Sequence, residues 1–140
     1  MESSTLSVAC IPSPVGFLEV TASDTGIRTV HFSDTPSEQA VFNLHVSACM
    51  RQLEEYFNGQ RKIFDVPLDL QGTEFQVKVW TELLKIPFGK TISYLTLARQ
   101  LGDEKVIRAA ASANGSNPIA ILVPCHRVVG SNGDLVVTKR

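Results

Sequence analysis

The chain has 140 residues, of which 44% are hydrophobic and 19% are charged, and its formal net charge is −1. These values are ordinary for a globular protein with one core or two small ones. No apolar run approaches the roughly 20 residues that a membrane-spanning helix needs, so we expect no membrane association.

Cysteine usage and the first residues indicate a reducing compartment. The start, Met1-Glu2-Ser3-Ser4, lacks the basic region and the apolar stretch of a secretory signal. The three cysteines, Cys10, Cys49 and Cys125, are odd in number and widely spaced, which does not fit a disulfide framework. We therefore predict a cytoplasmic protein, or a nuclear one in a eukaryote.

Charge is divided unequally along the chain. Residues 1–70 carry 4 basic and 9 acidic side chains, a net charge of −5, whereas residues 71–140 carry 9 basic and 5 acidic ones, a net charge of +4. This asymmetry predicts two modules, over 1–70 and 71–140, of which only the second suits a polyanion. The excess is modest, so bulk charge alone supports nucleic-acid binding only weakly.

Three short apolar segments separated by turn signals open the first module and predict an antiparallel meander. They are residues 6–11, 17–22 and 27–32. A sheet this small needs a helix over one face. Thr35-Pro36-Ser37-Glu38 has an N-cap threonine, a proline at the first helical position and a glutamate three residues after the cap. We expect that helix over about 36–57, ended by Asn58-Gly59.

Two potential metal ligands lie four residues apart on the expected helix. His45 and Cys49 could face the same side, with Cys10 or His31 as further ligands. No CxxC or HExxH pattern supports such a site, so we expect these side chains to pack and predict no metal. Residues 61–66 could add an extended segment before a connector between the modules.

The second module begins with the capping box Thr73-Glu74-Phe75-Gln76, which predicts a helix that ends before Pro87-Phe88-Gly89. Two shorter helices follow, one capped by Ser93 and the other reaching Asn114, with Gly102 breaking the chain between them. This is a helix-turn-helix arrangement, which by itself only suggests DNA.

One long cation stands among small side chains on the second of these helices. Arg108 is followed by Ala109-Ala110-Ala111-Ser112-Ala113. Small residues allow a close approach to a groove, although tight packing against the preceding helix explains several of these alanines equally well. Arg108 either points to solvent or reaches into something, and insertion into a DNA minor groove would suit it.

The stretch Pro124-Cys125-His126-Arg127-Val128 holds most of the reactive chemistry of the chain. Cysteine reacts as the thiolate, and a nearby imidazole or guanidinium lowers its pKa. His126 can reach Cys125 only if the chain bends there or a water bridges them, since adjacent side chains of an extended segment point to opposite faces. From these residues alone, a reactive thiol and a small buried core residue are equally good readings of Cys125.

Several motifs together resemble the O6-alkylguanine-DNA alkyltransferases, also called methylated-DNA–protein-cysteine methyltransferases. The motifs are Gly72-Thr73-Glu74-Phe75-Gln76 with Val79-Trp80, Ile86-Pro87-Phe88-Gly89-Lys90-Thr91 with Ser93-Tyr94, Asn117-Pro118, and Pro124-Cys125-His126-Arg127-Val128. Their order and spacing agree with the family over most of residues 6–134. The resemblance implies an α/β N-terminal domain, with a small antiparallel sheet plus a helix, followed by a mainly helical, winged helix-turn-helix-like domain.

The resemblance also implies the reaction. A monomer would bind double-stranded DNA containing O6-alkylguanine through the minor groove and flip the damaged base out of the helix. Cys125 would then take the alkyl group irreversibly from O6-alkylguanine. The resemblance also implies O4-alkylthymine as a possible second substrate. His126 would act as the base toward the thiol through water. No metal or organic cofactor is implied.

Further roles come from the same comparison with the family. Tyr94 would help to rotate the nucleotide, and Arg108 would take the place of the flipped base. Asn117 would brace the hinge between the recognition helix and the active-site strand, with Arg127 as further support of the site. Groups of Tyr94, Cys125 and Val128 would bind the guanine.

The end of the sequence departs from the family pattern. After Gly133-Asp134-Leu135 the family continues with a Gly-Tyr-x-Gly-Gly-Leu loop and a terminal helix, whereas this chain reads Val136-Val137-Thr138-Lys139-Arg140. The loop would supply a donor to O6 and the helix a glutamate that orients His126. We therefore expect a truncated or frameshifted alkyltransferase with impaired transfer, since losing one such donor costs ~100-fold or more in rate.

Three other functions compete with repair. A protein that binds alkylated DNA without repairing it would carry another residue at the position of Cys125, yet the departure at the C-terminus partly favours it. A winged-helix regulator with an incidental thiol would bind a specific sequence and tolerate Cys125→Ala. A cysteine hydrolase fits least, because no second base or oxyanion motif is evident.

Overall fold

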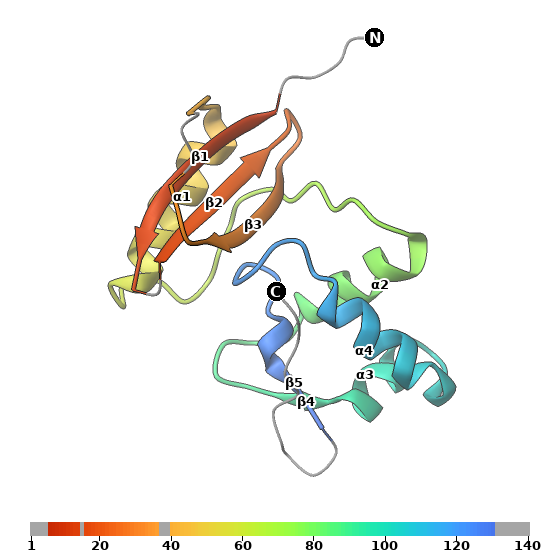
Figure 1. Ribbon diagram of the computed structural model, residues 1–140. Coiled ribbons are helices and arrows are strands. Elements are labelled where there is room, and N and C mark those ends of the chain that lie inside the picture. Colours follow the sequence, from red (N-terminus) through yellow and green to blue (C-terminus); the bar gives the residue numbers. More distant parts are fainter. Residues whose placement is uncertain (1–5, 15, 37–39, 131–140) are drawn as a thin grey trace, which may run out of the picture. The chain divides into compact units, whose positions relative to one another are not determined.

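Two compact units make up the chain, residues 1–70 and residues 71–140. The structure is a computed structural model, and it describes residues 6–14, 16–36 and 40–130 (Figure 1). No helix within these ranges is long and apolar enough to cross a membrane. The departure from the family pattern that we expect after Leu135 lies outside the described residues.

The first unit contains the predicted meander. Its strands are β1 (Ser7–Ser13), β2 (Gly16–Ala22) and β3 (Ile27–Ser33), which pair antiparallel in the order β1-β2-β3. The alternation of side chains gives the sheet two different faces. The face that packs against the helix is apolar; its buried strand residues include Ala9, Ile11, Leu18, Val20 and Val30.

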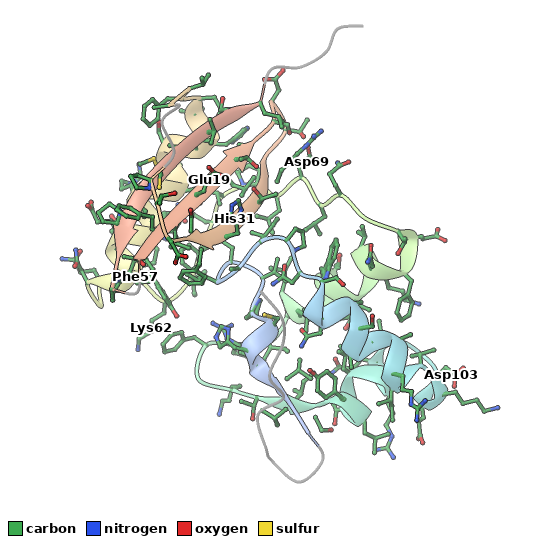
Figure 2. All side chains as sticks on the ribbon, viewed as in Figure 1. Glu19, His31, Phe57, Lys62, Asp69 and Asp103 are labelled. Carbon is green, nitrogen blue, oxygen red and sulfur yellow. The ribbon has the colours of Figure 1, made fainter. Side chains whose placement is uncertain are left out.

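The opposite face carries a row of polar side chains across the three strands. Cys10 is paired with Glu19, and Glu19 with His31. Figure 2 shows Glu19 and His31 on neighbouring strands, and His31 Nε2 lies 3.2 Å from Glu19 Oε1. His31 is exposed, so this contact contributes little to the stability of the sheet.

One helix, α1 (Leu44–Phe57), packs against the sheet (Figure 1). The prediction that it begins at about residue 36 is wrong. Asn43 caps it by accepting a hydrogen bond from Val46 N at 2.9 Å. The preceding backbone is committed to the sheet, because Val41 and Val8 exchange two N–H···O bonds of 2.8 Å. The predicted end is confirmed: Asn58 is the C-cap, and Gly59 follows with φ +75°.

The two potential metal ligands on α1 are separately accounted for. Cys49 is fully buried, and burial raises the pKa of its thiol to about 12. The His45 ring lies 3.1 Å from the main-chain oxygen of Asp24. Among the described residues no three His, Cys, Asp or Glu side chains are grouped so that they could hold a metal ion.

Residues 61–66 form no strand, contrary to the possibility of an extended segment there. Gln52, which is buried in α1, instead bonds Asp65 through both ends of its amide. The chain regains sheet-like pairing at Leu68, which forms an isolated parallel bridge with Ile27. Side-chain anchoring therefore replaces strand pairing in this segment.

The second unit is mainly helical, as predicted. Its elements are α2 (Glu74–Leu83), α3 (Tyr94–Gln100) and α4 (Ile107–Gly115), with a 3₁₀ turn over Glu104–Val106 and the two-residue parallel strands β4 (Ile92–Ser93) and β5 (Val128–Val129). The helices of this unit pack around a core of buried side chains. Its fully buried side chains include Val79, Trp80, Leu83, Leu97, Ala110 and Ile119.

Helix α2 begins at the predicted capping box. Thr73 Oγ1 accepts from Gln76 N at 3.0 Å, and the Gln76 side chain accepts from Thr73 N at 2.9 Å. Trp80, one turn later, donates from Nε1 to the main-chain oxygen of Ala113 at 2.9 Å and so ties α2 to α4. A Cβ on Gly72 would lie 2.7 Å from the Trp80 ring, so only glycine fits before the cap.

The helix-turn-helix consists of α3, the 3₁₀ turn and α4. Ser93 caps α3 by accepting from Thr96 N at 3.0 Å. Gly102 ends it with φ +100°, a conformation that costs little only for glycine. Asp103, at the turn between the two helices (Figure 2), accepts from Lys105 N at 2.9 Å and starts the next turn of helix.

Candidate active site and DNA-binding surface

Cys125 lies in a tight turn that the sequence forms around Pro124. Residues Cys125–Arg127 make a single 3₁₀ turn, in which Arg127 N donates to the Pro124 oxygen at 3.0 Å. Cys125 N donates to the Val123 oxygen at 2.8 Å. The chain thus bends at the point where His126 would need a bend to approach the thiol. Cys125 is half-buried, and among the described residues no hydrogen bond links it to His126.

The run Ile119–Val123 before this turn is not a strand, contrary to the expectation of an active-site strand. It folds as consecutive turns, because Asn117 holds both of its ends. Asn117 Oδ1 accepts from Ile119 N at 2.9 Å, and its Nδ2 donates to the Val123 oxygen at 2.8 Å. Ile121 has φ +72°, which for a β-branched residue costs about 1–3 kcal/mol.

Asn114 is the residue that sequence reasoning missed. Its side chain is 1% exposed, and its Nδ2 donates both to the Tyr94 hydroxyl at 3.0 Å and to the main-chain oxygen of Cys125 at 3.2 Å. The sequence pattern indicates Asn114 only as the end of a helix. A signal was present, because Asn114 continues the buried face of α4 that Ala110 and Ala113 begin, and a polar residue on such a face needs partners.

The two charged residues of the turn differ in their surroundings. His126 is exposed, yet partial desolvation and then the positive charge of Arg127 lower its pKa below the usual value of 6.5. Arg127 is half-buried: Nη1 donates to the Ile86 oxygen at 2.6 Å, and the guanidinium carbon lies 5.7 Å from the Phe88 ring centroid. Arg127 therefore fixes the loop after α2, while His126 stays a neutral base near pH 7.

The structure brings most of the predicted site residues together and leaves one apart. Tyr94, at 6% exposed, meets Cys125 through Asn114, and Val128, at 1% exposed, directly follows the turn. Arg108 is exposed on the first turn of α4, six residues before Asn114 and so about 9 Å further along the helix axis. No described residue pairs with its guanidinium.

The outward surface of α4 is made of small side chains behind Arg108. Ala109, Ser112 and Ser116 are exposed, whereas Ala110 and Ala113 are buried. The second unit therefore offers a smooth helix face with a long cation at its start. A face of this kind can approach a groove closely, and the cation can enter it.

The two units match two families over almost the whole chain. Residues 6–70 match the family described as "6-O-methylguanine DNA methyltransferase, ribonuclease-like domain". Residues 74–140 match "6-O-methylguanine DNA methyltransferase, DNA binding domain". The chain belongs to the 6-O-methylguanine DNA methyltransferase family.

Named relatives and solved structures agree with this assignment. The methylated-DNA–protein-cysteine methyltransferase of Methanosarcina acetivorans is 41% identical over 133 residues, which cover 91% of this chain and 85% of that protein. A probable enzyme of the same name from Acanthamoeba polyphaga mimivirus is 41% identical over 132 residues, 92% of this chain and 85% of that protein. The crystal structure of Mycobacterium tuberculosis O6-methylguanine methyltransferase has a TM-score of 0.84 and 39% identity, covering 95% of this chain and 84% of that one. The structure of the M. tuberculosis protein in complex with DNA gives 0.83 and 41%, covering 93% and 82%.

Proposed function

We propose that this protein repairs DNA by transferring the alkyl group of O6-alkylguanine to Cys125, once per chain. Family membership supports the reaction, and one observation supports the residue. Cys125 is the half-buried thiol in the 3₁₀ turn of the second unit, where Asn114 holds its main-chain oxygen. Cys49, by contrast, is buried with a pKa of about 12, so it would not form a thiolate at neutral pH.

The transfer is a displacement at the alkyl carbon. The Cys125 sulfur forms a bond to that carbon while the bond from carbon to O6 breaks, and the electron pair of the broken bond goes to the guanine. The thiol proton passes through water to His126, and the guanine, which leaves as an anion, takes one proton from water. The lowered pKa of His126 suits this role, because the imidazole is neutral and able to accept a proton near pH 7.

The product explains why each chain would act once. A thioether has a carbon–sulfur bond that thiol–disulfide exchange does not reverse, since that exchange attacks only disulfide sulfur. The cysteine is therefore not regenerated, and the number of alkyl groups that can be removed equals the number of chains. Such a protein is consumed as a reagent.

The partner is double-stranded DNA, and the target base has to leave the helix. O6 of a stacked guanine is inaccessible to a half-buried thiol, and extruding the nucleotide costs a few kcal/mol. We assign the small-residue face of α4 to the minor groove and Arg108 to the space left by the base. Tyr94 would contact the extruded nucleotide, and backbone groups of Cys125 and Val128 would bind its guanine.

Recognition of alkylated DNA without transfer is the second function weighed from the sequence. The relatives described above carry the names of methyltransferases, and this chain has a cysteine at the position where the reaction needs one. Transfer is therefore favoured over recognition alone.

Intact-mass spectrometry with a duplex that contains O6-methylguanine tests the proposal. One methyl group should be added per wild-type chain and none to Cys125→Ser, a near-isosteric control. The time course also gives the rate constant of transfer. Binding of the duplex without any gain in mass would instead show that this protein recognises alkylated DNA without repairing it. Methylation of the Cys125→Ser variant would show that a residue other than Cys125 accepts the alkyl group.

A further inference from the structure

Asn114 lies between two groups that the proposed reaction uses, the Tyr94 hydroxyl and the backbone of Cys125. It joins residues that are 20 and 11 positions away in the sequence. Its side chain is 1% exposed, its hydrogen bond to Tyr94 is buried and its hydrogen bond to Cys125 is partly buried, and hydrogen bonds are stronger in such a low-dielectric setting than in water. The amide therefore fixes how these two groups are presented.

The orientation of the amide follows from its acceptors. The main-chain oxygen of Cys125 can only accept, so the group that faces it at 3.2 Å has to be the donor Nδ2. The reversed amide would place two oxygens against each other. Nδ2 has two N–H groups, and the second is directed at the Tyr94 hydroxyl at 3.0 Å.

This arrangement decides the role of the Tyr94 hydroxyl. A phenol oxygen that accepts a hydrogen bond from an amide still has its own proton to donate. That proton is directed away from Asn114. Phosphate oxygens and the N3 atom of guanine are both acceptors, so Tyr94 is prepared as a donor toward an extruded nucleotide.

The other end of the Asn114 amide shows that the residue is not placed for stability alone. Asn114 Oδ1 is buried and has no hydrogen-bond partner among the described residues. An unsatisfied buried acceptor is destabilising, and each such group in a native protein calls for an explanation. The two hydrogen bonds that Asn114 Nδ2 donates explain the unpaired oxygen, because the amide has to face Tyr94 and Cys125 with its nitrogen.

We propose that Asn114 is a positioning residue, which sets the Tyr94 hydroxyl as a hydrogen-bond donor toward DNA while it fixes the main-chain oxygen of Cys125. The inference rests on the proposed alkyl transfer and deepens it. Asn114 itself need not touch the substrate. Its effect on the reaction should pass mainly through Tyr94.

A double-mutant cycle in single-turnover alkyl transfer tests this coupling. Asn114→Asp is nearly isosteric but faces both partners with acceptors, and Asn114→Ala removes the donors without adding charge. Each variant should slow transfer from a methylated duplex about tenfold, the order expected for one oriented hydrogen bond. The rate constant is measured on the folded fraction, while the final amount of methylated protein reports how much has folded.

Tyr94→Phe completes the cycle. Combining it with Asn114→Ala should slow transfer no more than Asn114→Ala does alone, because both changes remove the same donor to DNA. Independent, multiplicative effects of the two changes would overturn the inference, as would a wild-type rate in Asn114→Ala.

Gln52→Glu is a matched control. Gln52 is also a buried amide, but it lies in α1 and bonds Asp65, far in sequence from the site. Introducing a second carboxylate there should reduce the folded fraction and leave the rate constant unchanged. Failure of the wild-type protein to accept a methyl group would contradict the proposed function, whereas normal transfer by Asn114→Ala would contradict only the inference about Asn114.

Discussion

At the scale of single residues, the neighbours in the turn at Cys125 differ in how they are held: two are fixed by hydrogen bonds and one is exposed. The backbone of Cys125 is held by Asn114, and the side chain of Arg127 is held by Ile86. His126, between them in sequence, remains exposed and makes no hydrogen bond to a described residue. The thiol is thus presented by a fixed backbone, while His126, the proposed proton acceptor, keeps access to water.

The pH dependence of transfer should report His126. Because its pKa lies below 6.5, the rate constant should stay high at neutral pH and fall on acidification with a midpoint below 6.5. The native protein prefers neutral His126, so the same protonation lowers the free energy of unfolding as the pH falls through this range. A midpoint at or above 6.5 would show that another group acts as the base.

Arg127 offers a charge control for the same titration. Arg127→Met removes the positive charge that helps to lower the His126 pKa and should move the midpoint upward, whereas Arg127→Lys keeps the charge. Both variants lose the guanidinium contact with Ile86, so their difference isolates the charge. Equal midpoints in the two variants would contradict this cause.

At the scale of elements, local signals predicted what local contacts build. The capping box at Thr73 and the glycine turn at Gly102 lie where the sequence places them, because each needs only residues within one helical turn. The start of α1 was not predictable in this way. The signal at Thr35 is local, but Val41 pairs with Val8 of β1, a contact that no short pattern contains.

The candidate site divides along the same line. Cys125 could be predicted as the reactive cysteine only because its motif resembles that of a family, since its neighbouring residues alone left a buried core role equally possible. Asn114 owes its proposed importance to Tyr94 and Cys125, which are distant in the sequence. The run before Cys125 looks like a strand because it is apolar and β-branched. It forms turns instead because Asn117 satisfies the main chain at both ends.

Helix α4 yields a prediction at this scale. Arg108→Ala should slow transfer from a methylated duplex about tenfold or more, in keeping with roughly 1.5 kcal/mol for one charge-assisted contact. The free base should react at the wild-type rate, because it does not have to be flipped. Arg99→Ala is the control: Arg99 is equally a surface arginine of this unit, but its Nε already bonds Glu104 at 2.9 Å. An unchanged duplex rate in Arg108→Ala would remove this residue from the DNA contact.

At the scale of the whole molecule, charge is sorted between the two units. Residues 1–70 carry a net charge of −5 and residues 71–140 one of +4. The second unit would therefore attract DNA while the first would not. This division of charge can be counted from the sequence alone. The arrangement of Arg108 and the small side chains on the exposed face of α4 requires the structure.

Salt should weaken DNA binding in proportion to the phosphates contacted. The logarithm of the binding constant should fall linearly with the logarithm of the salt concentration, by about 0.9 for each phosphate neutralised. Lys105→Gln should make this slope shallower by about one contact, because Lys105 is exposed beside α4. Lys85→Gln should leave it unchanged, since Lys85 pairs with Glu82 at 2.8 Å. Equal slopes in wild type and Lys105→Gln would exclude Lys105 from the interface.

Burial of Cys49 gives the chain an internal reporter of its own integrity. A thiol with a pKa of about 12 in the core of the first unit is protected from alkylating reagents while that unit is folded, and becomes reactive when it opens. A second, chemically distinct label applied after repair would therefore mark Cys49 only in chains that have come apart. One mass spectrum could then distinguish spent protein that is still folded from spent protein whose first unit has unfolded.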